Sequence, residues 1–140
     1  MTENGDSDDI AAMNSIVKID AHIQTVRWEI FSTPEYKGGT PGPTDYVSLV
    51  AEAEIPGQDN LVKSRQSGEV WVAPEVSRAW MKKENRFFLE KYKNKKIDVS
   101  VVKNCWIISV KYLKKNTTVE GLICKTSSNY IIYIILEDYT

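Results

Sequence analysis

Two stretches of the chain alternate between apolar and polar residues, and this period of two predicts half-buried β-strands. In the longer stretch, Tyr46–Ile55, every second side chain is apolar, while Ser48, Glu52 and Glu54 fall on the opposite face. Gly68–Ala73 is a shorter segment with the same alternation. We therefore expect two strands here, with both glutamates on a face that meets solvent.

The segment Ile16–Phe31 fits two patterns at once. Its apolar residues alternate from Val17 to Ile23, and they alternate in the opposite phase from Val26 onward. A β-bulge near Gln24–Thr25 would absorb this change of phase, although the same apolar residues also recur at helical spacing. Because the segment is rich in β-branched and aromatic residues, we favour one long strand over a helix.

Residues from Glu75 to Tyr92 show the period of an amphipathic helix, and Pro74 suits its first turn because proline lacks the N–H that would be unpaired there. The residues predicted on its buried face are Val76, Trp80, Met81, Phe87, Phe88 and Tyr92. The basic residues predicted on its outward face are Arg78, Lys82, Arg86 and Lys93. The sequence therefore predicts a helix that lies across a sheet and turns a basic surface toward solvent.

The last third of the chain predicts three successive strands. Turns fall at Lys114–Thr117 and Thr126–Asn129, and the final strand, Tyr130–Leu136, is apolar at almost every position, which is typical of a strand covered on both faces. Together the elements predict an α+β domain, in which an antiparallel sheet of five or six strands packs on one amphipathic helix. Cystatin-like and NTF2-like folds have a similar general layout, and this is an analogy of shape alone.

Two further segments lack a strand or helix pattern. Met1–Ala12 is acidic and polar, so we expect a disordered tail or tether, and then one domain over residues 13–140. Such a tail follows the removed leader or the lipidated cysteine of an exported protein, and an expression scar that ends before Met13 fits equally well. Ser32–Thr44 contains three prolines and three glycines, which predicts a long loop. Tyr36 and Tyr46, in and beside this loop, would offer amphipathic contacts to a partner.

Charge is distributed unevenly along the 140 residues, although the net charge is only −1. Residues 1–59 carry 3 basic and 11 acidic side chains, a net of −8, and residues 60–140 carry 15 and 8, a net of +7. The two halves can attract each other within the fold, or the basic half can bind an anionic partner. Residues 78–96, with eight basic and two acidic side chains, are the strongest candidate for binding phosphate, anionic lipid, an acidic protein or nucleic acid. The predicted burial of the aromatic side chains and the pI of 5.9 argue against nucleic acid.

The two cysteines fall on strands that are predicted to pair. If the hairpin turns on Lys115–Asn116, Cys105 and Cys124 share a face within one diagonal step, and a small change in the turn makes them directly opposed. A disulfide would indicate an oxidising compartment, so we favour an exported protein (periplasmic, membrane-tethered or extracellular) over a cytoplasmic one with two reduced thiols. The cysteines lack the CxxC spacing of a redox catalyst.

Candidate catalytic residues are few. The single histidine, His22, excludes a multi-histidine metal site, and a hydrolase would have to use it with Glu52 or Glu54. The sequence has no glycine-rich phosphate loop, and we predict neither a cofactor nor a metal. No apolar run approaches the roughly 20 residues of a transmembrane helix. We therefore expect a small non-catalytic binding or accessory domain with a protein or small-molecule partner, and keep polyanion binding and a hydrolase as alternatives.

Overall fold

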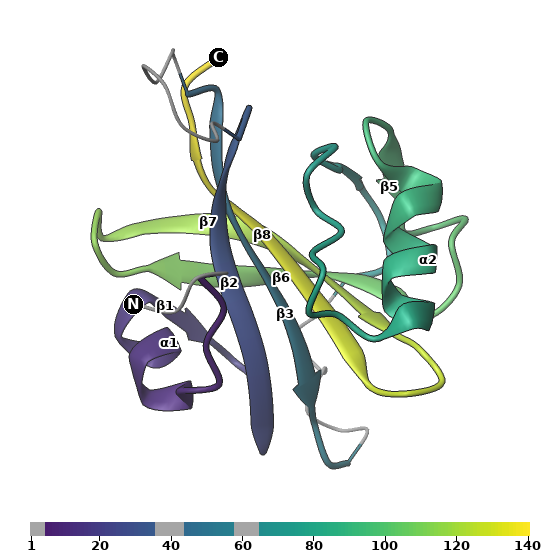
Figure 1. The fold of residues 1–140 in the computed structure, drawn as a ribbon, viewed down its shortest axis with the longest axis horizontal. Coiled ribbons are helices and arrows are strands. Elements are labelled where there is room, and N and C mark those ends of the chain that lie inside the picture. The colour runs from purple at the N-terminus through teal and green to yellow at the C-terminus, as the bar shows by residue number, and fades with distance from the viewer. Residues whose placement is uncertain (1–4, 36–43, 58–64) are drawn as a thin grey trace.

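The structure, a computed structural model, describes residues 5–35, 44–57 and 65–140. Its helices are α1 (Ile10–Ile16) and α2 (Lys83–Tyr92), and its strands are β1 (Val17–Ile19), β2 (Thr25–Thr33), β3 (Tyr46–Glu54), β4 (Glu69–Trp71), β5 (Lys96–Asp98), β6 (Cys105–Tyr112), β7 (Thr117–Lys125) and β8 (Tyr130–Asp138). Six strands form one curled antiparallel sheet, while β4 and β5 pair separately. Figure 1 shows α1 beside one side of the large sheet and α2 on the other. The α+β class and the antiparallel sheet are therefore confirmed.

The large sheet has the strand order β1-β6-β7-β8-β3-β2, and every adjacent pair is antiparallel. The three C-terminal strands, β6 to β8, are consecutive neighbours, as predicted. β8 is buried at nearly every position because it lies between β7 and β3 and carries apolar side chains on both faces. The predicted strand Tyr46–Ile55 corresponds to β3, and Gly68–Ala73 contains β4.

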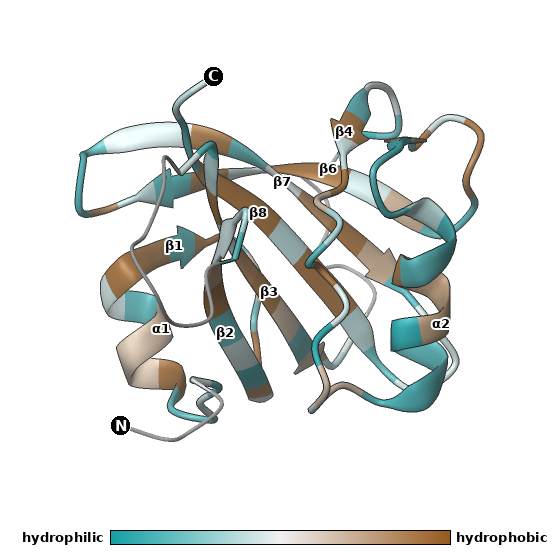
Figure 2. Cartoon of the chain, turned by 45° about the horizontal axis from the view of Figure 1, so that its top comes forward, coloured by the Kyte–Doolittle hydropathy of each residue, from teal (hydrophilic) through white to brown (hydrophobic). Residues whose placement is uncertain are grey.

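Each face of the large sheet carries its own apolar core. The core on the α1 side includes Met13, Val17, Trp28, Leu49 and Ile132. The core on the α2 side includes Val72, Leu89, Ile97, Ile107 and Tyr133. Figure 2 shows the apolar residues as brown bands along the strands of the sheet. The prediction of a sheet packed on one helix is not confirmed, since segments that contain α1 and α2 cover opposite faces.

The segment predicted as one long strand, Ile16–Phe31, is divided among three elements, so this prediction is wrong. α1 ends at Ile16, β1 pairs with β6 at one edge of the sheet, and β2 pairs with β3 at the other edge. The predicted bulge at Gln24–Thr25 is the point where β2 begins. The change of alternation phase marks a change of strand, which a period of two does not distinguish from a bulge.

The predicted disordered tail through residue 12 is not confirmed for the described residues. Ser7 and Trp28 exchange two backbone hydrogen bonds of 2.7 Å, so the N-terminal segment pairs with the outer edge of β2. The Asp9 carboxylate accepts a hydrogen bond from the Ala12 N–H at 3.0 Å and caps the start of α1. An acidic residue that suggested a tail therefore serves as a helix cap.

The predicted helix Glu75–Tyr92 is confirmed only from Lys83 onward, because the residues before it form successive turns. Leu89 is fully buried on the inner side of α2, whereas Phe87, two positions and roughly 200° away, is 73% exposed. The prediction of a buried Phe87 is therefore wrong, and Arg78 precedes the helix instead of lying on its outward face. Neither of the helices described here is long and apolar enough to cross a membrane.

Candidate functional site

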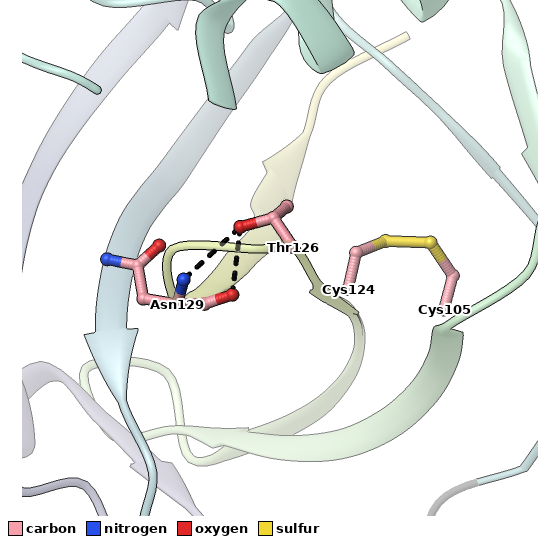
Figure 3. Close-up of a disulfide and its surroundings, with 4 residues drawn as sticks. All are labelled: Cys105, Cys124, Thr126 and Asn129. Atoms are coloured by element: carbon pink, nitrogen blue, oxygen red, sulfur yellow. Dashed lines mark hydrogen bonds between the residues drawn. A yellow bond between two sulfur atoms is a disulfide. The ribbon is translucent and has the colours of Figure 1, made fainter. Parts of the chain in front are cut away.

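Cys105 on β6 and Cys124 on β7 face each other directly, and their sulfur atoms are 2.11 Å apart, at disulfide-bonding distance. Figure 3 shows this bond between the two strands. The turn centres on Lys114–Lys115, one residue earlier than the turn used for the prediction, and this difference makes the cysteines directly opposed. Both side chains belong to the α2-side core and are 1% exposed. The pair is therefore a buried cross-link, unlike the exposed thiols of redox catalysts.

The turn between β7 and β8 attaches α2 to the disulfide-linked strands. The Thr126 hydroxyl donates to the Asn129 carbonyl oxygen at 2.9 Å, and the Asn129 N–H donates back to the hydroxyl oxygen at 3.3 Å (Figure 3). The Asn85 side-chain amide of α2 donates to the Asn129 Oδ1 at 2.9 Å. The Ser127 hydroxyl donates to the Glu84 carboxylate in the first turn of the helix. These hydrogen bonds attach the first turn of α2 to the β7–β8 turn of the large sheet.

Arg78 lies in an ion cluster formed with β2 instead of on an outward helix face. Its Nε and Nη2 atoms lie 2.9 and 3.0 Å from the two carboxylate oxygens of Glu29, and Nη2 lies 2.7 Å from Glu35. The Trp80 indole also donates to Glu29, at 2.7 Å. Partial burial of the guanidinium opposes its charge, but the hydrogen bonds to Glu35 and Glu29 outweigh this and raise the pKa of Arg78 above its ordinary value. Arg78 therefore anchors the turns before α2 to the sheet.

The two glutamates predicted on a solvent face have different surroundings. Glu52 is 5% exposed, and its Oε2 atom accepts hydrogen bonds from the Asn85 amide at 2.6 Å and from the Lys82 backbone N–H at 2.8 Å. Glu54 is exposed and accepts a hydrogen bond from the Thr25 hydroxyl at 2.6 Å. The prediction of a solvent-facing Glu52 is wrong, because the start of α2 lies over this face of β3. Glu52 fixes that start by capping it.

The remaining catalytic candidate, His22, is exposed between β1 and β2. Across residues 5–35, 44–57 and 65–140, no hydrogen bond joins His22 to Glu52 or Glu54, whose partners lie on α2 and β2. In the same part of the chain, no three histidine, cysteine, aspartate or glutamate side chains come together as a metal site. The hydrolase alternative stays a prediction.

The predicted loop Ser32–Thr44 lies mostly outside the described residues, and so does Tyr36. Tyr46 is the first residue of β3, and its ring centroid lies 4.8 Å from that of Trp71 on β4. This aromatic contact joins the small sheet to the large one. A role of the loop in binding stays a prediction.

The outward side of α2 and the residues just before and after the helix form a basic surface, which we call the α2 basic surface. All seven of its basic side chains are exposed: Lys82, Lys83, Arg86, Lys91, Lys93, Lys95 and Lys96. The same segment holds two acidic residues, Glu84, which is bonded to Ser127, and Glu90, which lies 3.0 Å from Lys93. Seven basic and two acidic side chains give the surface a net charge of +5.

Phe87 lies within the α2 basic surface, one helical turn from both Lys83 and Lys91. The sequence predicts Lys83 and Lys91 within the basic segment 78–96, but it does not predict an exposed Phe87, because the predicted helix begins eight residues too early. The sequence does contain a pattern that places Phe87 with these lysines, since Lys83 and Lys91 stand four residues before and after it. A helix that starts at Lys83 places all three on one side.

Two open grooves are also lined by described residues. One groove of about 500 Å³ lies where the β7–β8 turn meets the end of β3, and the other, of about 390 Å³, lies between α1, β2 and the β6–β7 turn. Glu137 lines the second groove, and hydrogen bonds from Lys115, Tyr112 and Tyr139 lower the pKa of its carboxyl to about 2. Burial and this carboxylate raise the pKa of Tyr112 to about 12. A carboxylate held ionised by three donors is not a general acid at neutral pH.

Comparisons with protein-family models, with curated proteins and with solved structures give no match. The cystatin-like and NTF2-like layouts therefore stay analogies of shape.

Proposed function

We propose that this protein is a small non-catalytic binding domain and that the α2 basic surface holds an anionic partner. The observation that carries the proposal is the exposure of seven basic side chains on one short segment of a chain whose net charge is −1. Such a concentration of like charge costs electrostatic free energy in the folded state, and an anionic partner removes that cost.

The buried polar residues have structural tasks that leave them little part in binding. Arg78 and Glu29 join the segment before α2 to β2, and Glu52 caps the helix. These contacts also support the proposal, because they fix α2 on its inner side while its outward side stays exposed. A surface that is already rigid loses little conformational entropy when it binds.

We further propose an exported location for this binding domain. The buried Cys105–Cys124 bond supports it, since disulfides persist in oxidising compartments and are rare in the cytosol. The isolation of the protein from its own cell with both thiols open to alkylation before reduction would contradict this part of the proposal.

The test of the binding surface uses fluorescent heparin as a polyanion probe, with affinity measured by anisotropy at rising salt concentrations. The wild-type protein should bind, and its affinity should fall as salt rises because counterions compete for the cations. The triple variant Lys83→Glu/Arg86→Glu/Lys91→Glu should bind about a hundredfold more weakly or worse, since it removes three cations that each contribute about 1 kcal/mol near an anionic surface, and about 1.4 kcal/mol corresponds to a tenfold change in affinity.

The matched control is the triple variant Lys18→Glu/Lys111→Glu/Lys114→Glu. It changes the net charge by the same amount, but its exposed residues lie on β1, β6 and the turn that follows β6. We expect it to bind heparin within about threefold of the wild type at physiological salt, where screening limits long-range attraction. Equal losses in the two triple variants would show that overall charge, and not the α2 basic surface, governs binding.

A further inference from the structure

The position of Phe87 narrows the class of anionic partner. Phe87 is 73% exposed, while Leu89 on the inner side of the same helix is fully buried. Another apolar side chain of α2, Phe88, packs on Tyr92 with ring centroids 5.2 Å apart. Phe87 therefore stands out as a large apolar ring that α2 turns toward solvent, with Lys83 and Lys91 four residues away and Glu84 and Glu90 three residues away on the helix.

A partner that is only charged would use the lysines and leave this ring in water. An anionic bilayer surface satisfies both features, because its headgroups attract cations and the region below them accepts apolar rings. Lys83 and Lys91 lie one turn on either side of Phe87, and their long side chains can reach the headgroups while the ring enters the membrane. A helix of ten residues is about 15 Å long and can lie flat on such a surface.

We propose that α2 docks on an anionic phospholipid surface, with Phe87 inserted between the headgroups and the surrounding cations paired with lipid phosphates. This inference rests on the proposed function, and it specifies the partner of the same surface. The helix docks in its folded position, since Asn85 and Leu89 stay buried against the sheet. The membrane contact is therefore peripheral and reversible, and salt weakens it.

The experiment measures co-sedimentation of the intact protein with two kinds of vesicle, pure phosphatidylcholine and phosphatidylcholine with about one quarter phosphatidylglycerol. The wild-type protein should bind the anionic vesicles and leave the neutral ones unbound. The variant Phe87→Asn should bind anionic vesicles about tenfold more weakly, because it loses the apolar transfer of the ring. Its affinity for heparin should stay unchanged, since heparin offers the ring no apolar region.

The matched control is Leu113→Asn, which removes another exposed apolar side chain, 39% exposed, from the β6–β7 turn. It should bind vesicles as the wild type does, and thermal unfolding should show that both variants fold. If Phe87→Asn binds anionic vesicles as well as the wild type, the membrane inference is wrong while heparin binding still supports the α2 basic surface. If the wild type binds neither heparin nor anionic vesicles, the proposed function itself is wrong.

Discussion

Replacing Arg78 with methionine should destabilise the fold by about 3 kcal/mol, because it leaves a buried carboxylate without its cation. The side chains of Arg78 and Glu29 are 15% and 6% exposed, and two hydrogen bonds of 2.9 and 3.0 Å join them. The substitution also removes the 2.7 Å contact with Glu35. Methionine keeps most of the apolar length of arginine, so the loss reports mainly on charge and hydrogen bonding.

The magnitude follows from what remains around Glu29 after the substitution. Breaking a buried ion pair by removing one partner costs about 3–5 kcal/mol. The Trp80 indole still donates to Glu29 at 2.7 Å, which places the expected loss at about 3 kcal/mol, the lower end of that range. In a Glu29→Gln background the same Arg78→Met change should cost only about 1 kcal/mol, because no buried charge is then left alone.

The assay is urea unfolding at neutral pH, followed by tryptophan fluorescence. The control is Arg65→Met, which breaks the ion pair with Glu120 at an N–O distance of 2.5 Å. That pair is closer, but its side chains are 49% and 54% exposed, so the control should lose less than about 1 kcal/mol. Losses of similar size for Arg78→Met and Arg65→Met would refute the reasoning that burial decides the strength of these pairs.

Three other features of the fold can each be tested by one change: the disulfide, the Glu137 carboxylate and Gly121. The double variant Cys105→Ala/Cys124→Ala should lose about 3 kcal/mol in chemical unfolding, since the bond closes a sequence separation of 19 residues in the unfolded chain; equal stability of oxidised and reduced wild type would contradict this. Because the pKa of Glu137 falls from 4.5 to about 2 on folding, the ionised carboxylate contributes to the free energy of unfolding above pH 4.5, and this contribution is lost as pH falls toward 2. Solvent screening at the half-exposed Lys115 limits that loss. In urea titrations at each pH, the free energy of unfolding of the wild type should fall by about 1–2 kcal/mol more than that of Glu137→Gln over this range. Gly121→Val should lower stability by about 2 kcal/mol or more, since even a β-carbon there would lie 3.1 Å from side chains of β6 and β8, and an unchanged melting temperature would oppose that.

The sequence predicts most strands because alternation and apolar runs are local properties. The bounds of β3, Tyr46–Glu54, agree with the predicted strand Tyr46–Ile55 to within one residue, and the apolar run Tyr130–Leu136 becomes the central strand β8. The pairing of Cys105 with Cys124 is also nearly predictable, because it depends only on where one short turn is centred. Elements of this kind need no knowledge of distant contacts.

The start of α2 and the burial of Glu52 depend on such distant contacts. The Glu52 carboxylate accepts hydrogen bonds from the Lys82 N–H and the Asn85 amide, which lie 30 and 33 residues away in the sequence. A helical wheel drawn from Glu75 contains no information about these contacts, so it places Phe87 on the wrong side. Alternation along β3 likewise shows two faces of the strand without showing that both are covered.

The uneven charge of the chain has two separate consequences in the folded protein. Attraction between the acidic and basic halves is present where Arg78 contacts Glu29 and Glu35, and it works inside the fold. The seven basic side chains from 82 to 96 are exposed. Glu90, paired with Lys93, and Glu84, bonded to Ser127, reduce the net charge of this surface only to +5. The two consequences should therefore separate by experiment. Arg78→Met should lower stability and leave heparin affinity unchanged under folding conditions. Lys83→Glu should lower heparin affinity and leave stability unchanged.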